Sequence, residues 1–132
     1  MSLLWGIIDD NSLILKGEND LKIISIEYPT ALSEIEDINN DNIDVFVTLD
    51  DGITYVVVVF TPINYYWCME NENIDYFNGC PNLIVKVLTE DNIRRAIEAC
   101  LENDAYWLKF QQVYGTIRVE ELDEIIKKSQ LE

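Results

Sequence analysis

The chain has 132 residues, which is a usual length for one domain, and 48% of them are hydrophobic, far more than in a disordered chain. Its formal net charge is −16, from 25 acidic and nine basic residues. A surface of this sign repels phosphate groups, so we expect neither a nucleic acid nor an anionic membrane as a partner. We expect a basic protein as the partner instead.

Neither a membrane span nor a secretory signal is visible in the sequence. The longest unbroken apolar run, Tyr55–Phe60, is far too short to cross a bilayer. The start of the chain lacks the basic residues that open a signal peptide. The three cysteines, Cys68, Cys80 and Cys100, form no CxxC pair, so we expect free, partly buried thiols. These features favour a cytoplasmic protein.

Charge is distributed unevenly along the chain. No lysine or arginine lies between Lys22 and Lys86. The acidic residues of that span are Glu27, Glu34, Glu36, Asp37, Asp41, Asp44, Asp50, Asp51, Glu70, Glu72 and Asp75. The middle of the sequence is therefore an unbroken acidic field.

Short strands are predicted at the start of the chain. Residues 3–8 and 12–15 are apolar stretches joined by a turn at 9–11, which is the pattern of a hairpin. Residues 21–28 are rich in isoleucine and form the next predicted strand. A short helix is predicted over residues 30–37.

A second hairpin is predicted over residues 43–60. Residues 43–49 and 53–60 flank Asp50-Asp51-Gly52, a sequence that favours a tight turn. The run Tyr55–Phe60 has no polar alternation. We therefore expect this strand to lie centrally in the sheet with both of its faces covered.

The segment 63–72 is compatible with two structures. Thr61-Pro62 suits the start of a helix, with threonine as N-cap and proline in the first turn. Three consecutive aromatic residues equally favour continuation as a strand. The sequence leaves this choice open, and it then predicts a turn at 78–81 and a strand at 83–88.

Helices are predicted in the last part of the chain. Thr89 is the expected N-cap of a helix that continues to Leu101, with apolar residues at helical spacing. An interruption at Asn103-Asp104 precedes a helix over 105–112, and a last helix is predicted over 119–129. The apolar residues that we expect this last helix to bury are Leu122, Ile125 and Ile126.

These elements predict an α+β fold for the whole chain. We expect a mostly antiparallel sheet of about five or six strands with two or three helices, the helices concentrated in the C-terminal third. No repeat, low-complexity tract or flexible linker divides the sequence. We therefore expect a single domain spanning residues 1–132.

The sequence excludes several kinds of site. Triads of the Ser-His-Asp or Cys-His type need an imidazole, and the chain contains no histidine. The five glycines are isolated, so there is no phosphate-binding loop. Residues 37–41 resemble the start of an EF-hand loop, but Asn42 and Thr48 occupy the positions that need glycine and glutamate. We expect a solvated loop there, and no cofactor.

Aromatic and acidic residues gather in the segment 65–77. The candidate partner-binding residues are Tyr65, Tyr66, Trp67, Glu70, Glu72, Asp75, Tyr76 and Phe77. Aromatic side chains ringed by charge are typical of protein interfaces. Core packing with a solvated acidic rim is the competing interpretation, and a carboxylate-based sugar-cleaving site is a further one.

Three functions follow from these features. The leading hypothesis is a non-catalytic module that binds a basic protein, such as an immunity or inhibitor protein that neutralises a basic toxin nuclease. The alternative is an enzyme that works through carboxylates, with a divalent cation held by residues such as Asp50 and Asp51. The third is self-association, which the negative charge opposes, and the sequence leaves monomer and homodimer open.

Overall fold

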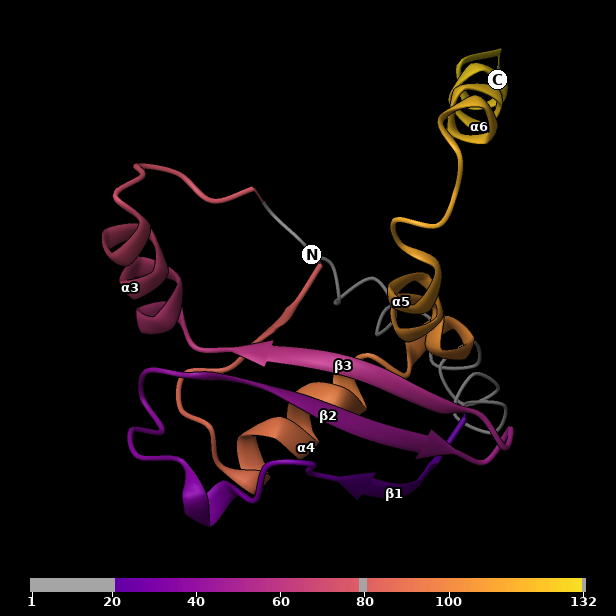
Figure 1. Cartoon of the computed structure of the whole chain (residues 1–132). Helices are drawn as coiled ribbons and strands as arrows, with labels where there is room; N and C mark the ends of the chain where they lie inside the picture. The colour runs from indigo at the N-terminus through magenta and orange to yellow at the C-terminus, as the bar shows by residue number, and fades with distance from the viewer. Residues whose placement is uncertain (1–20, 79–80, 132) are drawn as a thin grey trace, which may run out of the picture.

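The computed structural model describes residues 21–78 and 81–131. The strands of this part are β1 (Ile23–Glu27), β2 (Asn42–Leu49), β3 (Thr54–Phe60) and β4 (Leu83–Ile84). Its helices are α3 (Pro62–Glu72), α4 (Glu90–Ala99), α5 (Glu102–Val113) and α6 (Val119–Leu131), with η1 (Leu32–Glu34) as a single 3-10 turn. The predicted α+β class is confirmed, and three of the four described α-helices lie in the last third of the chain, as expected. Figure 1 shows α6 standing away from the sheet.

β2 and β3 form the hairpin that the sequence predicts. They pair antiparallel from Asn42 opposite Phe60 to Thr48 opposite Thr54. Gly52 in the turn has a φ of 83°, a left-handed value that glycine adopts without steric cost. β1 pairs antiparallel with β2, so these three strands form a meander.

β4 differs from the strand predicted over residues 83–88. It is two residues long and pairs with β3 in parallel, because α3 carries the chain across from the end of one strand to the start of the other. β3 ends where Pro62 begins α3, so the chain after Ile84 runs past the end of β3 and pairs with no strand of residues 21–78 and 81–131.

The predicted mostly antiparallel sheet of five or six strands is therefore a four-stranded mixed sheet in the described residues. The strands predicted over 3–8 and 12–15 lie outside these residues. The helix predicted over 30–37 is reduced to η1, because no side chain caps its start and Ile35 returns at once to an extended backbone.

The core lies between one face of the sheet, α4 and the buried side of α5. Alternate residues of β2 and β3 point into it, as the two-residue period of a strand requires. Its buried members are Ile43, Val45, Val47, Leu49, Tyr55, Val57, Val59, Leu83, Val85, Leu88, Ile93, Ile97, Ala105 and Leu108. β3 is central, as predicted, but the expectation that both its faces are covered is wrong. Val56 is exposed and Val58 is half-buried, because α4 packs on the opposite face.

Two threonines begin helices, Thr89 at the start that the sequence predicts and Thr61 at the start of the segment that the sequence leaves open. The Asn64 N–H donates to the Thr61 hydroxyl at 3.2 Å, and the Asn92 N–H donates to the Thr89 hydroxyl at 3.1 Å. The ambiguous segment 63–72 is therefore helical, and α3 ends at Asn73 with a left-handed φ of 56°. No helix of the described part combines the length and the apolar character needed to cross a membrane.

α5 closes the edge of β3 that β4 is too short to reach. The Gln112 side chain accepts from the Val56 N–H at 3.1 Å and donates to the Val56 carbonyl at 3.0 Å. The predicted interruption at Asn103-Asp104 is confirmed, since both residues and Ala105 have left-handed φ values at the start of α5.

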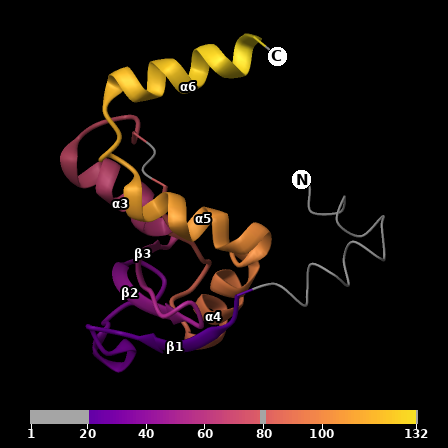
Figure 2. The ribbon, with the colours of Figure 1, turned by 90° about the vertical axis from the view of Figure 1, so that its right-hand side faces the viewer.

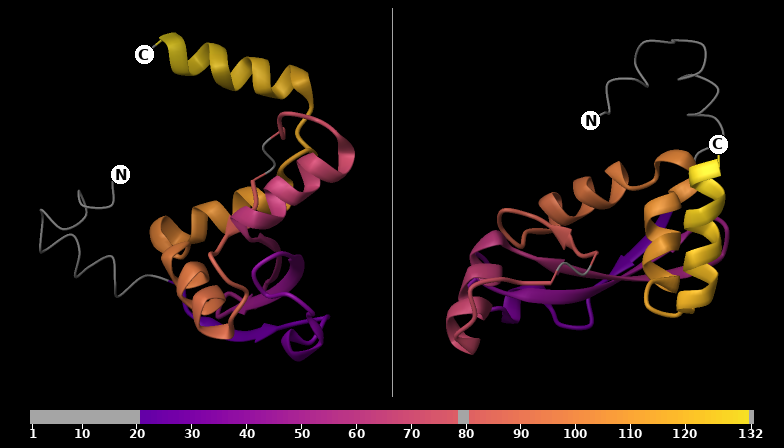
Figure 3. Two further views of the ribbon diagram at one scale, coloured as in Figure 1. Left: turned by 90° about the vertical axis from the view of Figure 1, so that its left-hand side faces the viewer. Right: turned by 90° about the horizontal axis from the view of Figure 1, so that it is seen from above.

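α6 begins where it was predicted, but it does not bury its apolar side chains. Leu122, Ile125 and Ile126 are all exposed, and no residue of α6 is buried. The reason is its placement, because the segment around Gly115 leads the chain away from the sheet (Figures 1 and 3). The sequence shows an apolar helix face but not whether an element of the same chain covers it.

The hairpin turn is held by Asp51. The Tyr55 hydroxyl donates to Asp51 Oδ2 at 2.7 Å, and the Ile53 N–H donates to Asp51 Oδ1 at 2.9 Å. The Tyr55 hydroxyl lowers the pKa of the Asp51 carboxyl. Burial, followed by the hydrogen bond to Asp51, raises the pKa of Tyr55 to about 12.

Tyr55→Phe tests this contact. The variant is expected to lose about 1 kcal/mol of unfolding free energy at neutral pH, because the hydrogen bond to Asp51 is lost. The folded wild type keeps the Tyr55 proton between pH 10 and about 12, while the unfolded chain releases it, so this stability disappears across that interval. Urea denaturation should show a wild-type advantage that shrinks over the same range. An advantage independent of pH, or an equal loss in the exposed control Tyr76→Phe, would contradict the assignment.

Candidate functional site

The inner side of α3 is fixed by one buried amide. The Asn64 side chain donates to Asn40 Oδ1 at 2.9 Å and accepts from Asn42 Nδ2 at 2.8 Å. The backbone adds a bond from the Thr61 N–H to the Asp41 carbonyl at 3.3 Å. The first turn of α3 is thereby tied to the loop that precedes β2. The same loop contains the residues that resemble the start of an EF-hand, and in the structure it anchors α3.

Two of the candidate aromatics hold α3 against the end of β3. Tyr65 stacks on Phe60 with ring centroids 4.4 Å apart, and Phe77 meets the Tyr65 ring edge-on at 5.0 Å. The Tyr65 hydroxyl also accepts from Asn82 Nδ2 at 3.0 Å. Tyr65 is therefore half-buried and holds α3 in place, while Phe77 contributes to the stack and remains exposed.

The outer side of α3 carries the other two large aromatics of this helix. Ile63, Tyr66, Trp67 and Glu70 are spaced i, i+3, i+4 and i+7, which places them on one helix face. Tyr66 is 63% exposed, Trp67 is 50% exposed, and Ile63 and Glu70 are also exposed. We call these four residues the α3 ridge. Ile63 was not among the predicted site residues, because its place on the ridge depends on the segment being helical.

The remaining candidates lie at the end of α3 and just beyond it. Glu72, Asp75 and Tyr76 are exposed. The ion pairs of the described residues are Arg95 with Asp91, Lys109 with Asp104, and Arg118 with Glu121, all in α4 to α6 or beside them. No carboxylate on α3 or in the segment after it takes part in one, so the surroundings of the α3 ridge keep their negative charge.

The acidic residues of the enzyme alternative are not brought together. Asp50 accepts from the Lys22 N–H at 3.0 Å, and Asp51 holds the hairpin turn, both just before the start of β3, whereas α3 follows the end of that strand. A strand of this length separates its ends by roughly 20 Å. Among residues 21–78 and 81–131, no cluster of three or more Cys, Asp or Glu side chains could hold a metal ion.

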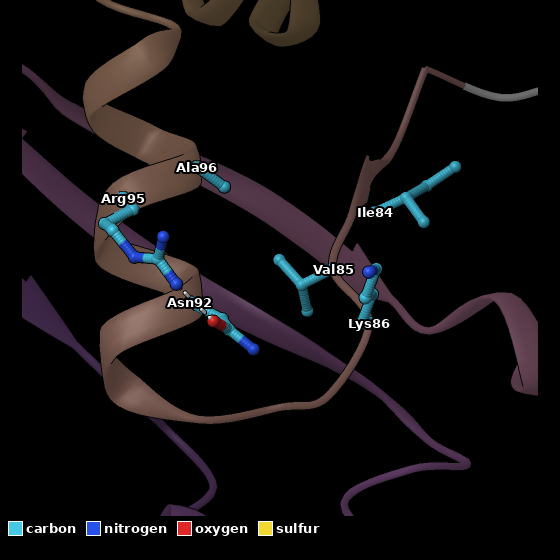
Figure 4. Close-up of a pocket in the computed structure, with 6 residues that line it drawn as sticks. All are labelled: Ile84, Val85, Lys86, Asn92, Arg95 and Ala96. Carbon is cyan, nitrogen blue, oxygen red and sulfur yellow. Dashed lines mark hydrogen bonds between the residues drawn. The ribbon is translucent and has the colours of Figure 1, made fainter.

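A separate groove lies between β4 and α4 (Figure 4). Its volume is about 290 Å³, and its lining residues are Ile84, Val85, Lys86, Asn92, Arg95 and Ala96. Arg95 donates to Asp91 at 3.0 Å and to Asn92 at 2.8 Å, so its guanidinium is already engaged. This lining contains no carboxylate, hydroxyl or thiol, and its charged side chains are the cations of Lys86 and Arg95.

The two cysteines of the described residues are free and half-buried, as predicted, while Cys80 lies outside them. Burial, with Glu72 nearby, raises the pKa of the Cys68 thiol. Burial, with Glu102 nearby, raises the pKa of the Cys100 thiol to about 11. Both thiols are therefore protonated at neutral pH and are poor nucleophiles.

The chain matches no protein-family model, no curated protein and no solved structure. No relative therefore carries a function over to it. The α3 ridge is the feature of the described residues that bears most directly on function. Its helix is held on the opposite side by Asn64 and Tyr65, and carboxylates surround it.

Asn64→Ala tests the anchor of α3. The variant should lose about 1–3 kcal/mol of unfolding free energy, because the amides of Asn40 and Asn42 lose their partner in a partly buried setting. Urea denaturation measures the loss. Asn71→Ala, at an exposed position of the same helix, should change stability by less than about 0.5 kcal/mol. Equal effects of the two substitutions would show that Asn64 does not anchor the helix.

Proposed function

We propose that this chain is a non-catalytic binding module that captures a basic protein on the α3 ridge. The observation that carries the proposal is the exposure of Tyr66 and Trp67 on one face of a helix that is fixed on its other side. Residues spaced i, i+3, i+4 and i+7 are the anchors of a helix that lies in a partner's groove. Tyrosine and tryptophan are also enriched among the residues that dominate binding energy.

The anchoring of α3 supports this role because it lowers the entropic cost of binding. The ridge side chains are carried by a helix whose first turn is bonded to the loop before β2 and whose Tyr65 is stacked on Phe60. A partner therefore meets a surface that is already in its binding conformation. Little ordering of the backbone remains to be done on association.

The charge around the ridge selects the kind of partner. Glu70, Glu72 and Asp75 are exposed, and no basic residue lies between Lys22 and Lys86 to neutralise them. Such a field accelerates encounter with a positively charged protein and disfavours acidic ones. An immunity or inhibitor protein that neutralises a basic toxin nuclease has these requirements, and we propose this class for the chain.

A pull-down from lysate of the source cell, with this chain as bait, tests the proposal. We expect one basic protein that is retained at about 0.05 M salt and lost at about 0.5 M salt, because screening weakens the attraction. The double variant Tyr66→Ala, Trp67→Ala should bind the purified partner at least about tenfold more weakly, as loss of central aromatic anchors does. Replacing Glu70, Glu72 and Asp75 by their amides should mainly slow association.

Tyr106→Ala is the matched control for this experiment. Tyr106 is 64% exposed, close to the value of Tyr66, but it lies on α5. Its replacement should leave the affinity unchanged. A partner that binds the ridge double variant as tightly as wild type, or whose binding does not depend on salt, would contradict the proposal.

A further inference from the structure

We propose that α6 is a self-association element, through which two copies of the chain pair with their α6 helices antiparallel. The helix presents Val119, Leu122, Ile125 and Ile126 on one side, yet none of its residues is buried. A helix of 13 residues is marginally stable in water on its own and normally depends on packing of its apolar face. A surface that covers this face is therefore expected.

The described part of the chain covers only the first turn of α6. Leu122 shares a hollow of about 270 Å³ with Phe110, Tyr114 and Ile117 at the junction of α5 and α6. Beyond this junction α6 stands clear of the sheet and of the other helices (Figures 2 and 3). Ile125 and Ile126, which are 57% and 51% exposed, are not covered by any other described element.

The apolar surface at the junction continues along α5. Phe110 lines the hollow shared with Leu122 and also a second hollow with Tyr106, Lys109 and Val113. The exposed apolar face of α6 is thus continuous with exposed side chains on α5. A second helix that packs on α6 can extend its contact onto this surface.

The charges of α6 identify a second copy as the occupant. The first half of the helix carries Glu120, Glu121, Asp123 and Glu124, and the second half carries Lys127 and Lys128. If two copies pair antiparallel with Leu122 opposite Ile126 of the other copy, Glu120 and Glu121 lie at the level of Lys128 and Lys127 of that copy. Parallel pairing would place like charges level with each other.

An antiparallel arrangement has two further advantages. The helix dipoles oppose each other, so each acidic N-terminal end lies beside a basic C-terminal end. A two-fold rotation also relates the two copies, so each uses the same α6 face. No free α6 face then remains to bind a third copy, and association stops at a dimer. The exposed ion pairs set the orientation more than the strength, and burial of the apolar face supplies the attraction.

The net charge of the chain determines the salt dependence. Two copies that carry −16 each repel one another, and added salt screens this repulsion. Dimerisation should therefore strengthen from about 0.05 to 0.5 M salt. This is the reverse of the salt dependence expected for capture of a basic partner by α3, so the failure of one proposal is distinguishable from the failure of the other.

Sedimentation velocity of the full chain, over a concentration series at both salt levels, measures the association. We expect a monomer–dimer equilibrium in which Ile126→Asp weakens the dimer at least about tenfold, because it places a charge in the apolar interface. Ile53→Asp is the control, since Ile53 is also 51% exposed but lies beside the hairpin turn. A monomer at every concentration and both salt levels, or a dimer that Ile126→Asp leaves intact, overturns the proposal.

A charge exchange tests the orientation. A chain with Glu120→Lys and Glu121→Lys, and a second chain with Lys127→Glu and Lys128→Glu, should each self-associate less than wild type. Their equimolar mixture should form a heterodimer, because opposite charges again lie level in the antiparallel pair. Circular dichroism verifies that each variant is folded. Self-association of both variants at wild-type strength would exclude the antiparallel pairing, because a parallel pair already places like charges level in the wild type, and a preference for the mixture alone fits both orientations.

Discussion

The junction between β3 and α3 is the constraint on which the rest of the structure depends. Pro62 ends the strand and begins the helix, and the buried Asn64 amide joins that first turn to Asn40 and Asn42. The helical crossover that results makes β4 parallel to β3 and limits it to two residues. The same junction turns Tyr65 inward onto Phe60 and leaves Tyr66 and Trp67 facing outward.

The ion pairs and the carboxylates around α3 lie in different parts of the fold. The ion pairs found in the described residues all lie from α4 onward, where the lysines and arginines are concentrated. The carboxylates around α3 have no such partners among the described residues, so the cost of their mutual repulsion remains there. Binding of a basic protein would relieve that repulsion. In the proposed function the acidic surface attracts the partner and the α3 ridge contacts it.

Local signals in the sequence predicted the local structure well. The turn residues at Asp50–Gly52 and the cap at Thr89 are defined within a few residues of chain, and both are confirmed, while the cap at Thr61 settles a choice that the sequence left open. Non-local features were wrong or missed: the cover over the second face of β3, the length of β4, and the burial of α6. The hydrogen bond between Asn64 and Asn40 joins residues 24 positions apart, and no repeating pattern in the sequence indicates it. Which aromatics face outward could be derived only once the segment 63–72 was known to be helical.

Ionic quenching of Trp67 fluorescence tests the account most directly. The chain has three tryptophans, so Trp5→Phe and Trp107→Phe leave Trp67 as the sole reporter. An exposed indole in a negative field should emit as a solvated tryptophan and should be quenched more by caesium than by iodide at low salt, with the difference fading as salt is added. Emission typical of a buried indole that neither ion quenches, or stronger quenching by iodide, would contradict the claim that the α3 ridge is an exposed aromatic surface in an acidic field.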